Sequence, residues 1–466
     1  MDKKSVLGNI SIAFAAQGVS MTASIIMSLL VPKVLGIENY GYWQLFVFYV
    51  SYSGFFHFGL NDGVYLVQGG ISRNQIDKLV INSQFHFAIV LQLIIGVLIA
   101  ATAFIIAPDE ERAYVLLAFS VYTVIYNLSG YLGYVFQAMN ETRIFSISSI
   151  LDRIIFLVPM IVLIAMSVND FRPYVFAYLF SRFCSLIYCC YCAKDILRAG
   201  SKNFMDSAKL SFHSIAIGCS LMFANICDNL ILGVVRFFID SAWGIEAFGS
   251  VSFALSMVNF FIVFVSQAAM VLFPALRQGT QQEQRDFYVV ARDATEVVFP
   301  AVYLLYFPIS ALLSLWLPQY SSSMLYFAIL LPICVFNTKM NICCTTYFKV
   351  MRMERLLLAI NLITLVASVI FASISVWLLG SIEAALLGST ICIIGRSIWC
   401  ERYFNTVMEL NGGFAPIMEV ALTLAFVLFA LLLEPIPAVV AFSIVLCIYL
   451  FTIRNTVMSL FRRLKR

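Results

Sequence analysis

The chain has 466 residues, of which 62% are apolar, 15% aromatic and only 12% charged, and its formal net charge is +4. This composition excludes a soluble globular domain, which would need far more polar surface. It predicts an all-α, polytopic membrane protein, and the small positive charge indicates topology and no nucleic-acid partner.

Apolar stretches long enough to cross a bilayer recur along the whole chain, since a spanning helix needs about 20 apolar residues. About fourteen spans are expected, the twelfth being the shortest: 9–32, 42–66, 81–107, 114–138, 144–167, 173–193, 212–238, 248–276, 292–317, 323–348, 356–379, 384–400, 415–433 and 436–454. No small-residue cleavage site follows the start at Met1, so we expect the first span to remain as an anchor.

A short motif occurs twice: GIENYG begins at Gly36 after the first span, and GIEAFG begins at Gly244, 208 residues later. Six spans separate the copies, and an even number returns the chain to the same side of the membrane. The motif therefore indicates an internal duplication with parallel halves, related by an axis along the membrane normal. We expect an N-terminal six-helix lobe over 1–200, a C-terminal six-helix lobe over 201–405, and two extra helices with a basic tail over 406–466.

Glycines flank several of these short connections. They are expected either to let helix ends bend as the lobes rock or to act as ordinary loop punctuation. The residues concerned are Gly36, Gly41, Gly59, Gly63, Gly244 and Gly249.

The cations fix an orientation, because positive residues in short loops are retained in the cytoplasm. With the N-terminus inside, alternate connections and the C-terminal tail collect nearly all of them, whereas Lys33, Arg112 and Arg172 alone fall on the opposite side. Both termini are therefore expected in the cytoplasm, with the protein in the cell (inner) membrane.

The sequence lacks features that several classes of membrane protein require. No loop exceeds about 20 residues, no G-x-x-x-x-G-K-[ST] phosphate loop occurs, and His57, His86 and His213 lie on different spans. We therefore expect neither an ATP-driven transporter nor a metal site or cofactor. The twelve cysteines, including Cys189-Cys190-Tyr191-Cys192, fall in or beside spans, where a thiol acts as a small packing residue.

The candidate functional residues are ionisable side chains within spans, each of which costs about 2.5 to 3.5 kcal/mol on insertion scales unless it faces protein or water. Arg182 lies roughly 14 Å below the outer surface at 1.5 Å per residue. Tyr174, Tyr178 and Ser185 share its helix face. This polar stripe indicates an anion-attracting cavity or a structural pairing with an acid such as Asp152.

Other candidates carry two interpretations each. Asp152 and Arg153 point about 100° apart, so Arg153 is expected to face a cavity and Asp152 to join helices, or the reverse. Asp228 shares a face with Asn225 and Arg236, which favours helix pairing and leaves ion coupling open.

Two cations lie nearer the cytoplasmic ends of their spans. Lys339 is offset from the Asn337, Asn341, Thr345 stripe, and it is expected either to snorkel or to meet a substrate entering from inside. Arg396 is expected to act as a cytoplasmic anchor.

Three segments carry a family resemblance: VLGIENYGYW after the first span, FGLNDGVY from Phe58 to Tyr65, and DNLILG from Asp228 to Gly233. Together with duplicated halves and two extra C-terminal spans, they resemble a polysaccharide repeat-unit flippase of the multidrug/oligosaccharidyl-lipid/polysaccharide exporter superfamily.

The resemblance implies a MATE-like, V-shaped pair of lobes around a central cavity that opens to either side in turn. It also implies a substrate, undecaprenyl-diphosphate-linked oligosaccharide, for the assembly of surface polysaccharide such as O-antigen, lipopolysaccharide or capsule. Arg182, Arg153 and Lys339 would suit its diphosphate, and Tyr174 and Tyr178 its sugars. The bilayer and other membrane proteins of polysaccharide assembly would be partners, and the extra helices over 415–454 would hold the lipid tail.

Two other functions remain as alternatives. The first span lacks a core carboxylate, which disfavours a cation-coupled multidrug exporter but leaves the energy source open, with Asp152 and Asp228 as candidate ion sites. A membrane enzyme acting on lipid-linked sugar would need an acidic or metal cluster at a membrane face. The only such acidic run, Asp109-Glu110-Glu111, lies in a short loop without a histidine.

Overall fold

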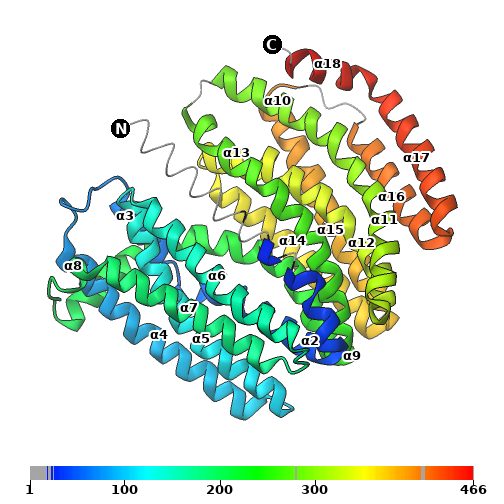
Figure 1. Ribbon diagram of the computed structural model, residues 1–466. Helices are drawn as coiled ribbons and strands as arrows, with labels where there is room; N and C mark the ends of the chain where they lie inside the picture. Colours follow the sequence, from blue (N-terminus) through cyan, green and yellow to red (C-terminus); the bar gives the residue numbers. More distant parts are fainter. Residues whose placement is uncertain (1–17, 19–21, 25, 279–280, 411–414, 465–466) are drawn as a thin grey trace. The chain divides into compact units, whose positions relative to one another are not determined.

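The computed structural model describes residues 18, 22–24, 26–278, 281–410 and 415–464 (Figure 1). Every regular element in these ranges is helical, which confirms the all-α class. Two compact units divide the chain, Met1–Ile226 and Cys227–Arg466. The expected three-part division over 1–200, 201–405 and 406–466 stays a prediction.

Within the described residues, nine helices are long and apolar enough to cross a membrane, or ten if the bent pair Thr22–Leu29 and Val31–His57 is one span. The shortest expected span, 384–400, belongs to a helix of 26 residues, Ile382–Val407. The count of fourteen stays a prediction. The span at 9–32 lies largely outside the described residues, those at 212–238 and 248–276 lie in one long helical run, and the one at 415–433 is a shorter apolar helix.

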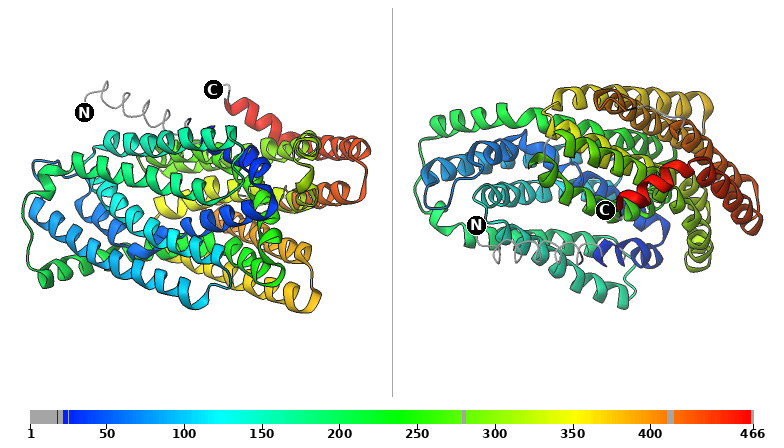
Figure 2. Two further views of the ribbon diagram at one scale, coloured as in Figure 1. Left: turned by 60° about the horizontal axis from the view of Figure 1, so that its bottom comes forward. Right: turned by 90° about the horizontal axis from the view of Figure 1, so that it is seen from above.

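The first unit contains a bundle in which α4, α5, α6 and α7 lie side by side (Figures 1 and 2). Asp77 and Asp109 cap the amino ends of α4 and α5, where their carboxylates accept hydrogen bonds from the backbone N–H groups of Val80 and Arg112. The elements are α2 (Val31–Val50), η1 (Ser53–His57), α3 (Leu60–Gln68), α4 (Lys78–Ile106), α5 (Glu110–Ala138), α6 (Thr142–Ala165), α7 (Arg172–Cys192), α8 (Lys194–Leu197) and the first part of α9 (Phe204–Gln278).

The two copies of the GIE motif lie inside helical runs, not in loops between spans. Gly36 within α2 has φ 71° and ψ −176°, and Gly244 within α9 has φ 79° and ψ −171°, so each run is bent at its glycine. Only glycine adopts such angles readily. The equivalent bends agree with the duplication expected from the motif.

The second expected span, 42–66, is interrupted. After α2 the chain forms η1, passes through left-handed Phe58 and Gly59, and resumes as α3. Gln92 donates a hydrogen bond to the carbonyl of Phe56, and Asn127 donates one to the carbonyl of Ser53. Irregular backbone at membrane depth requires such partners, because lipid supplies none.

The glycines of the FGLNDG segment permit close helix packing. A Cβ atom at Gly59 would lie 2.6 Å from the backbone nitrogen of Cys219, and one at Gly63 would overlap the carbonyl oxygen of Ser214. On α9, Gly218 meets Gly59 and Gly63 in the same way. The pairs Gly59/Gly63 and Ser214/Gly218 thus form a small-xxx-small contact, in which backbones touch without intervening side chains.

The second unit contains the remainder of α9 and the elements that follow it. Within it, α12 packs against α11, α15 and α16, and α17 packs against α11 and α16. The elements are α10 (Gln281–Val298), η2 (Phe299–Ala301), α11 (Val302–Trp316), η3 (Pro318–Tyr320), α12 (Ser321–Lys339), η4 (Met340–Thr345), α13 (Thr346–Val350), α14 (Glu354–Ile374), η5 (Ser375–Leu379), α15 (Ile382–Val407), α16 (Ala415–Leu432), α17 (Pro435–Thr452) and α18 (Arg454–Leu464).

Candidate functional site

Arg182 on α7 is paired with the acid that the sequence suggested. Its Nη1 lies 3.3 Å from Oδ2 of Asp152 on α6, and Ser181 donates a hydrogen bond to Oδ1 of the same carboxylate at 3.1 Å. The guanidinium also stacks over Tyr126, 4.6 Å from its ring centroid. These contacts support the structural-pairing interpretation of Arg182 and the helix-joining role of Asp152.

Arg153, one residue further along α6, is different. It is half-buried, and it makes no hydrogen bond or ion pair within the part of the chain that the structure describes. Its electrostatic neighbours are Tyr178, Asp152, Tyr122 and Arg182. Because Asp152 is paired with Arg182, Arg153 is the cation of these two arginines that remains available to bind an anion.

The two candidate tyrosines of α7 have unequal surroundings. Tyr174 is wholly buried and donates its hydroxyl to the carbonyl of Val168 at 3.0 Å. Tyr178 is only half-buried, and its ring meets Trp43, Phe46 and Phe156 edge to face at centroid distances of 5.0 to 6.0 Å. Of the two, only Tyr178 is partly exposed.

Sequence reasoning missed the aromatic side chains that complete this cluster. Tyr122 and Tyr126 lie four residues apart on α5, with ring centroids 5.5 Å apart, and Tyr122 also meets Tyr178 at 5.6 Å. The i, i+4 spacing of two tyrosines on one span was the available signal. We call Tyr122, Tyr126, Arg153, Tyr178 and Arg182 the aromatic–arginine cluster.

In the second unit, Asp228 pairs with a partner that the sequence did not suggest. Its carboxylate forms an ion pair with Arg396 of α15, which also donates hydrogen bonds to Asn361 at 3.1 Å and Asn337 at 3.0 Å. The expected anchoring role of Arg396 is wrong: the residue is 4% exposed, because it satisfies polar groups of three neighbouring helices. Arg236 donates to Ser252 at 2.7 Å instead of joining Asp228.

Lys339 is enclosed by carboxylates. Its Nζ lies 2.7 Å from Glu401 on α15, 2.7 Å from Glu419 on α16 and 3.8 Å from Glu296 on α10, and its side chain is 1% exposed. The expectation that it snorkels is therefore wrong, because the ammonium group of Lys339 does not reach the surface. A substrate role for Lys339 would require these three carboxylates to release it.

Glu296, Glu401 and Glu419 were not singled out from the sequence, because each lies near the end of a predicted span, where charged residues are ordinary. Only the packing of α10, α12, α15 and α16 shows that they converge. We call Lys339 and these three residues the lysine–glutamate cluster.

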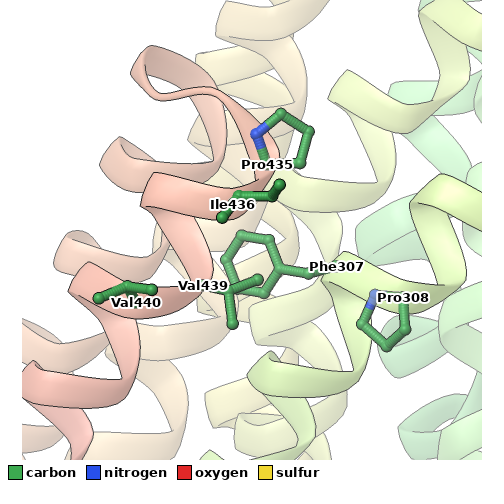
Figure 3. A pocket seen from close by; sticks show the side chains of 6 residues that line it. All are labelled: Phe307, Pro308, Pro435, Ile436, Val439 and Val440. Atoms are coloured by element: carbon green, nitrogen blue, oxygen red, sulfur yellow. The ribbon is translucent and has the colours of Figure 1, made fainter.

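An apolar groove lies between α11 and α17, with a volume of about 410 Å³. Figure 3 shows Phe307 and Pro308 of α11 opposite residues of the first turns of α17. The lining residues from α17 are Pro435, Ile436, Val439 and Val440.

A metal-binding site is not evident in these clusters. Across the described ranges, no group of three or more His, Cys, Asp and Glu side chains is arranged to hold a metal ion.

Residues 6–280 match the family model described as polysaccharide biosynthesis protein. The chain belongs to this family. No curated protein matches it at a significant level.

Solved structures share the fold of this chain. The chain resembles an inward-facing multidrug resistance MATE family transporter of the MOP superfamily, with a TM-score of 0.66 and 13% identity over 85% of this chain and 98% of that one. It also resembles the lipid II flippase MurJ in an inward closed conformation, with a TM-score of 0.65 and 12% identity over 97% of this chain and 100% of that one. These likenesses confirm the MATE-like fold with its two lobes, and the protein is a multi-pass membrane protein.

Proposed function

We propose that this protein is a flippase that translocates undecaprenyl-diphosphate-linked oligosaccharide repeat units across the cytoplasmic membrane by alternating access, for the assembly of surface polysaccharide. Family membership and the fold shared with transporters and a lipid II flippase support a role in transport rather than bond-making chemistry. Both termini would lie in the cytoplasm, with the lipid-linked glycan and the bilayer as partners.

The observation that carries the proposal is Arg153, a half-buried cation without an ion-pair partner among the described residues, which interacts electrostatically with Tyr178. A diphosphate carries several negative charges, and the planar fork of arginine suits phosphate oxygens. Aromatic rings offer flat apolar surface to the faces of sugar rings. In this proposal Arg153 binds the diphosphate and Tyr178 contacts the first sugar. Arg182 and Tyr174 hold these two residues in position, Arg182 through its ion pair with Asp152 and Tyr174 through Trp43, which contacts both tyrosines.

The groove between α11 and α17 suits the isoprenoid tail, because its named lining residues are all apolar (Figure 3). Burial of apolar surface contributes about 25 cal/mol per Å². The tail would remain in an apolar setting while the polar head moves.

Asp152 and Asp228, each paired with an arginine, serve in this proposal as interhelical partners. Lys339 would contact the substrate only if its carboxylates release it.

The test measures flipping of undecaprenyl-diphosphate-linked oligosaccharide in proteoliposomes. Arg153→Ala should lower the rate at least tenfold, and Arg153→Lys should lie between it and wild type, because lysine keeps the charge and loses the fork. Arg143→Ala, at the exposed start of the same helix, is the matched control. Equal rates for Arg153→Ala and wild type would remove Arg153 from the site. Export of cationic drugs without glycan flipping would favour a multidrug exporter, and conversion of the glycan would favour an enzyme.

A further inference from the structure

The lysine–glutamate cluster holds more negative charge than its surroundings balance. One ammonium faces three carboxylates, and all four side chains are 1 to 3% exposed. Arg292 lies nearby, but its guanidinium is 3.0 Å from Asp293 and 3.9 Å from Glu296, so Asp293 is its main ion-pair partner. With every group ionised, the cluster would carry a net charge of −2.

Such an excess is costly. An uncompensated ion away from water is strongly destabilised, even after the surrounding structure relaxes. The Oε1 atom of Glu419 has no hydrogen-bond donor among the described residues, although it is buried. A buried carboxylate oxygen without a donor indicates that a positive charge or a proton belongs in the cluster.

The geometry favours a proton over a metal ion, because these glutamates are not arranged as metal ligands. The three carboxylates also differ in how well they are neutralised. Glu401 and Glu419 each lie 2.7 Å from the ammonium of Lys339, whereas Glu296 is 3.8 Å from Lys339 and 3.9 Å from Arg292. Glu296 is therefore too far from either cation to accept a short, charge-assisted hydrogen bond, whereas Glu401 and Glu419 are each at that distance from Lys339.

We propose that the lysine–glutamate cluster is a proton-binding site with Glu296 as the proton carrier. Protonation of Glu296 lowers the net charge from −2 to −1 and leaves Lys339 to bridge Glu401 and Glu419. The charged and titratable groups around Glu296 come from five further elements and from α10 itself: Lys339, Cys343, Glu401, Glu419, Tyr449, Arg292 and Asp293.

Proton binding here would act on helix packing, because the cluster joins helices that are distant in the sequence. Glu296 belongs to α10, Lys339 to α12, Glu401 to α15 and Glu419 to α16. Its use as the energy source for transport rests on the proposed flippase function, whereas proton binding itself does not.

The first test is infrared difference spectroscopy of the full-length protein in lipid nanodiscs as the pH is varied, since a protonated carboxylic acid has a carbonyl band that carboxylates lack. We expect this band in the wild type at neutral pH, its loss in Glu296→Gln, and its retention in Glu434→Gln, whose exposed glutamate precedes α17. Absence of the band from the wild type, or its persistence in Glu296→Gln, would overturn the proposal.

Thermal unfolding gives a second measurement. An amide resembles a protonated acid, so Glu296→Gln should keep the wild-type Tm at neutral pH. A marked fall in Tm would show that Glu296 is needed as an ion, which contradicts the proposal. In proteoliposomes, an imposed pH gradient should accelerate flipping by wild type and not by Glu296→Gln. If no glycan is flipped by either, the proposed function fails, and the infrared band still decides whether the cluster binds a proton.

Discussion

Gly36 and Gly244 adopt nearly the same backbone conformation, with φ of 71° and 79° and ψ of −176° and −171°, at corresponding positions of two repeated motifs. A Cβ atom at either residue would meet nothing within 4 Å. Glycine is therefore required at both positions by the backbone angles, not by lack of space.

Replacing either glycine tests this relationship. Gly36→Ala and Gly244→Ala should each destabilise the protein by about 1 to 3 kcal/mol, the cost of a side chain in this conformation, or should straighten the helix. The measurement is Tm in detergent or nanodiscs. Gly54→Ala is the control, because its Cβ atom would lie at an ordinary 3.7 Å from Tyr126 and its φ is not positive. Equal Tm values for all three variants would contradict the argument.

The contact of Gly63 with α9 predicts a different kind of failure. Gly63→Ala places a methyl group against the backbone of Ser214, which must separate α3 from α9. Overpacking of this kind costs about 1 to 3 kcal/mol or more. Lower yield and lower Tm are expected, whereas Gly395→Ala, with open space around its Cβ position, should match the wild type. A normal Tm for Gly63→Ala would show that the helices separate readily.

The ion pair of Arg182 and Asp152 predicts coupling between two substitutions. Arg182→Gln leaves a half-buried carboxylate without its cation, and Asp152→Asn leaves the reverse, so each single variant should lose stability. The double variant should recover a large part of the loss. A double-mutant cycle on the free energy of unfolding measures the coupling, and additive losses would contradict direct pairing.

A charge network at the helix ends of the first unit predicts a pH dependence. Asp195 accepts from Arg73 at 2.6 Å and from Lys78 at 2.7 Å, while Arg73 also pairs with Glu141 at 2.7 Å. Burial acts to raise the pKa of Asp195, but the hydrogen bond from Lys78 and the charge of Arg73 outweigh it and hold the pKa below its usual value.

Because the folded-state pKa of Asp195 is lowered, its contribution to stability is present above the unfolded value of about 3.9 and is lost as the pH falls through the folded value. Asp195→Asn should therefore lower Tm at neutral pH, with a difference that shrinks toward strongly acidic pH. Partial exposure limits the effect to about 1 kcal/mol or less. Asp206→Asn, which lacks a cation partner among the described residues, should show no such trend. A loss for Asp195→Asn that does not change with pH would exclude the electrostatic explanation.

The sequence predicted features that depend on composition and spacing. The helical class and most of the span positions follow from apolar run length. The pairing of Arg182 with Asp152 was one of two interpretations that the cost of charge in lipid suggested, beside an anion-attracting cavity. The lysine–glutamate cluster could not be predicted, because its members lie on four helices and look individually like residues of helix ends. The partner of Asp228 was missed for the same reason: Arg396 is 168 residues away in the chain.

Glycines show a similar division. Of the glycines singled out from the sequence, those with a left-handed backbone are Gly36, Gly59 and Gly244, whereas Gly41, Gly63 and Gly249 lie in regular helix. Sequence spacing alone does not show that Gly59 permits close helix packing whereas Gly36 permits a bend, because these roles depend on the three-dimensional structure around each glycine.

The hairpin of α16 and α17 has a charged contact near one end and an apolar groove near the other. Glu419 lies in the first turns of α16, and about 20 Å of helix at 1.5 Å per residue separates it from Leu432, where α16 ends shortly before Pro435 begins α17. A stiff helical pair of that length behaves as a lever. A small tilt of the hairpin at the lysine–glutamate cluster would become a larger displacement of Pro435 relative to Phe307 of α11, and would thereby change the width of the groove.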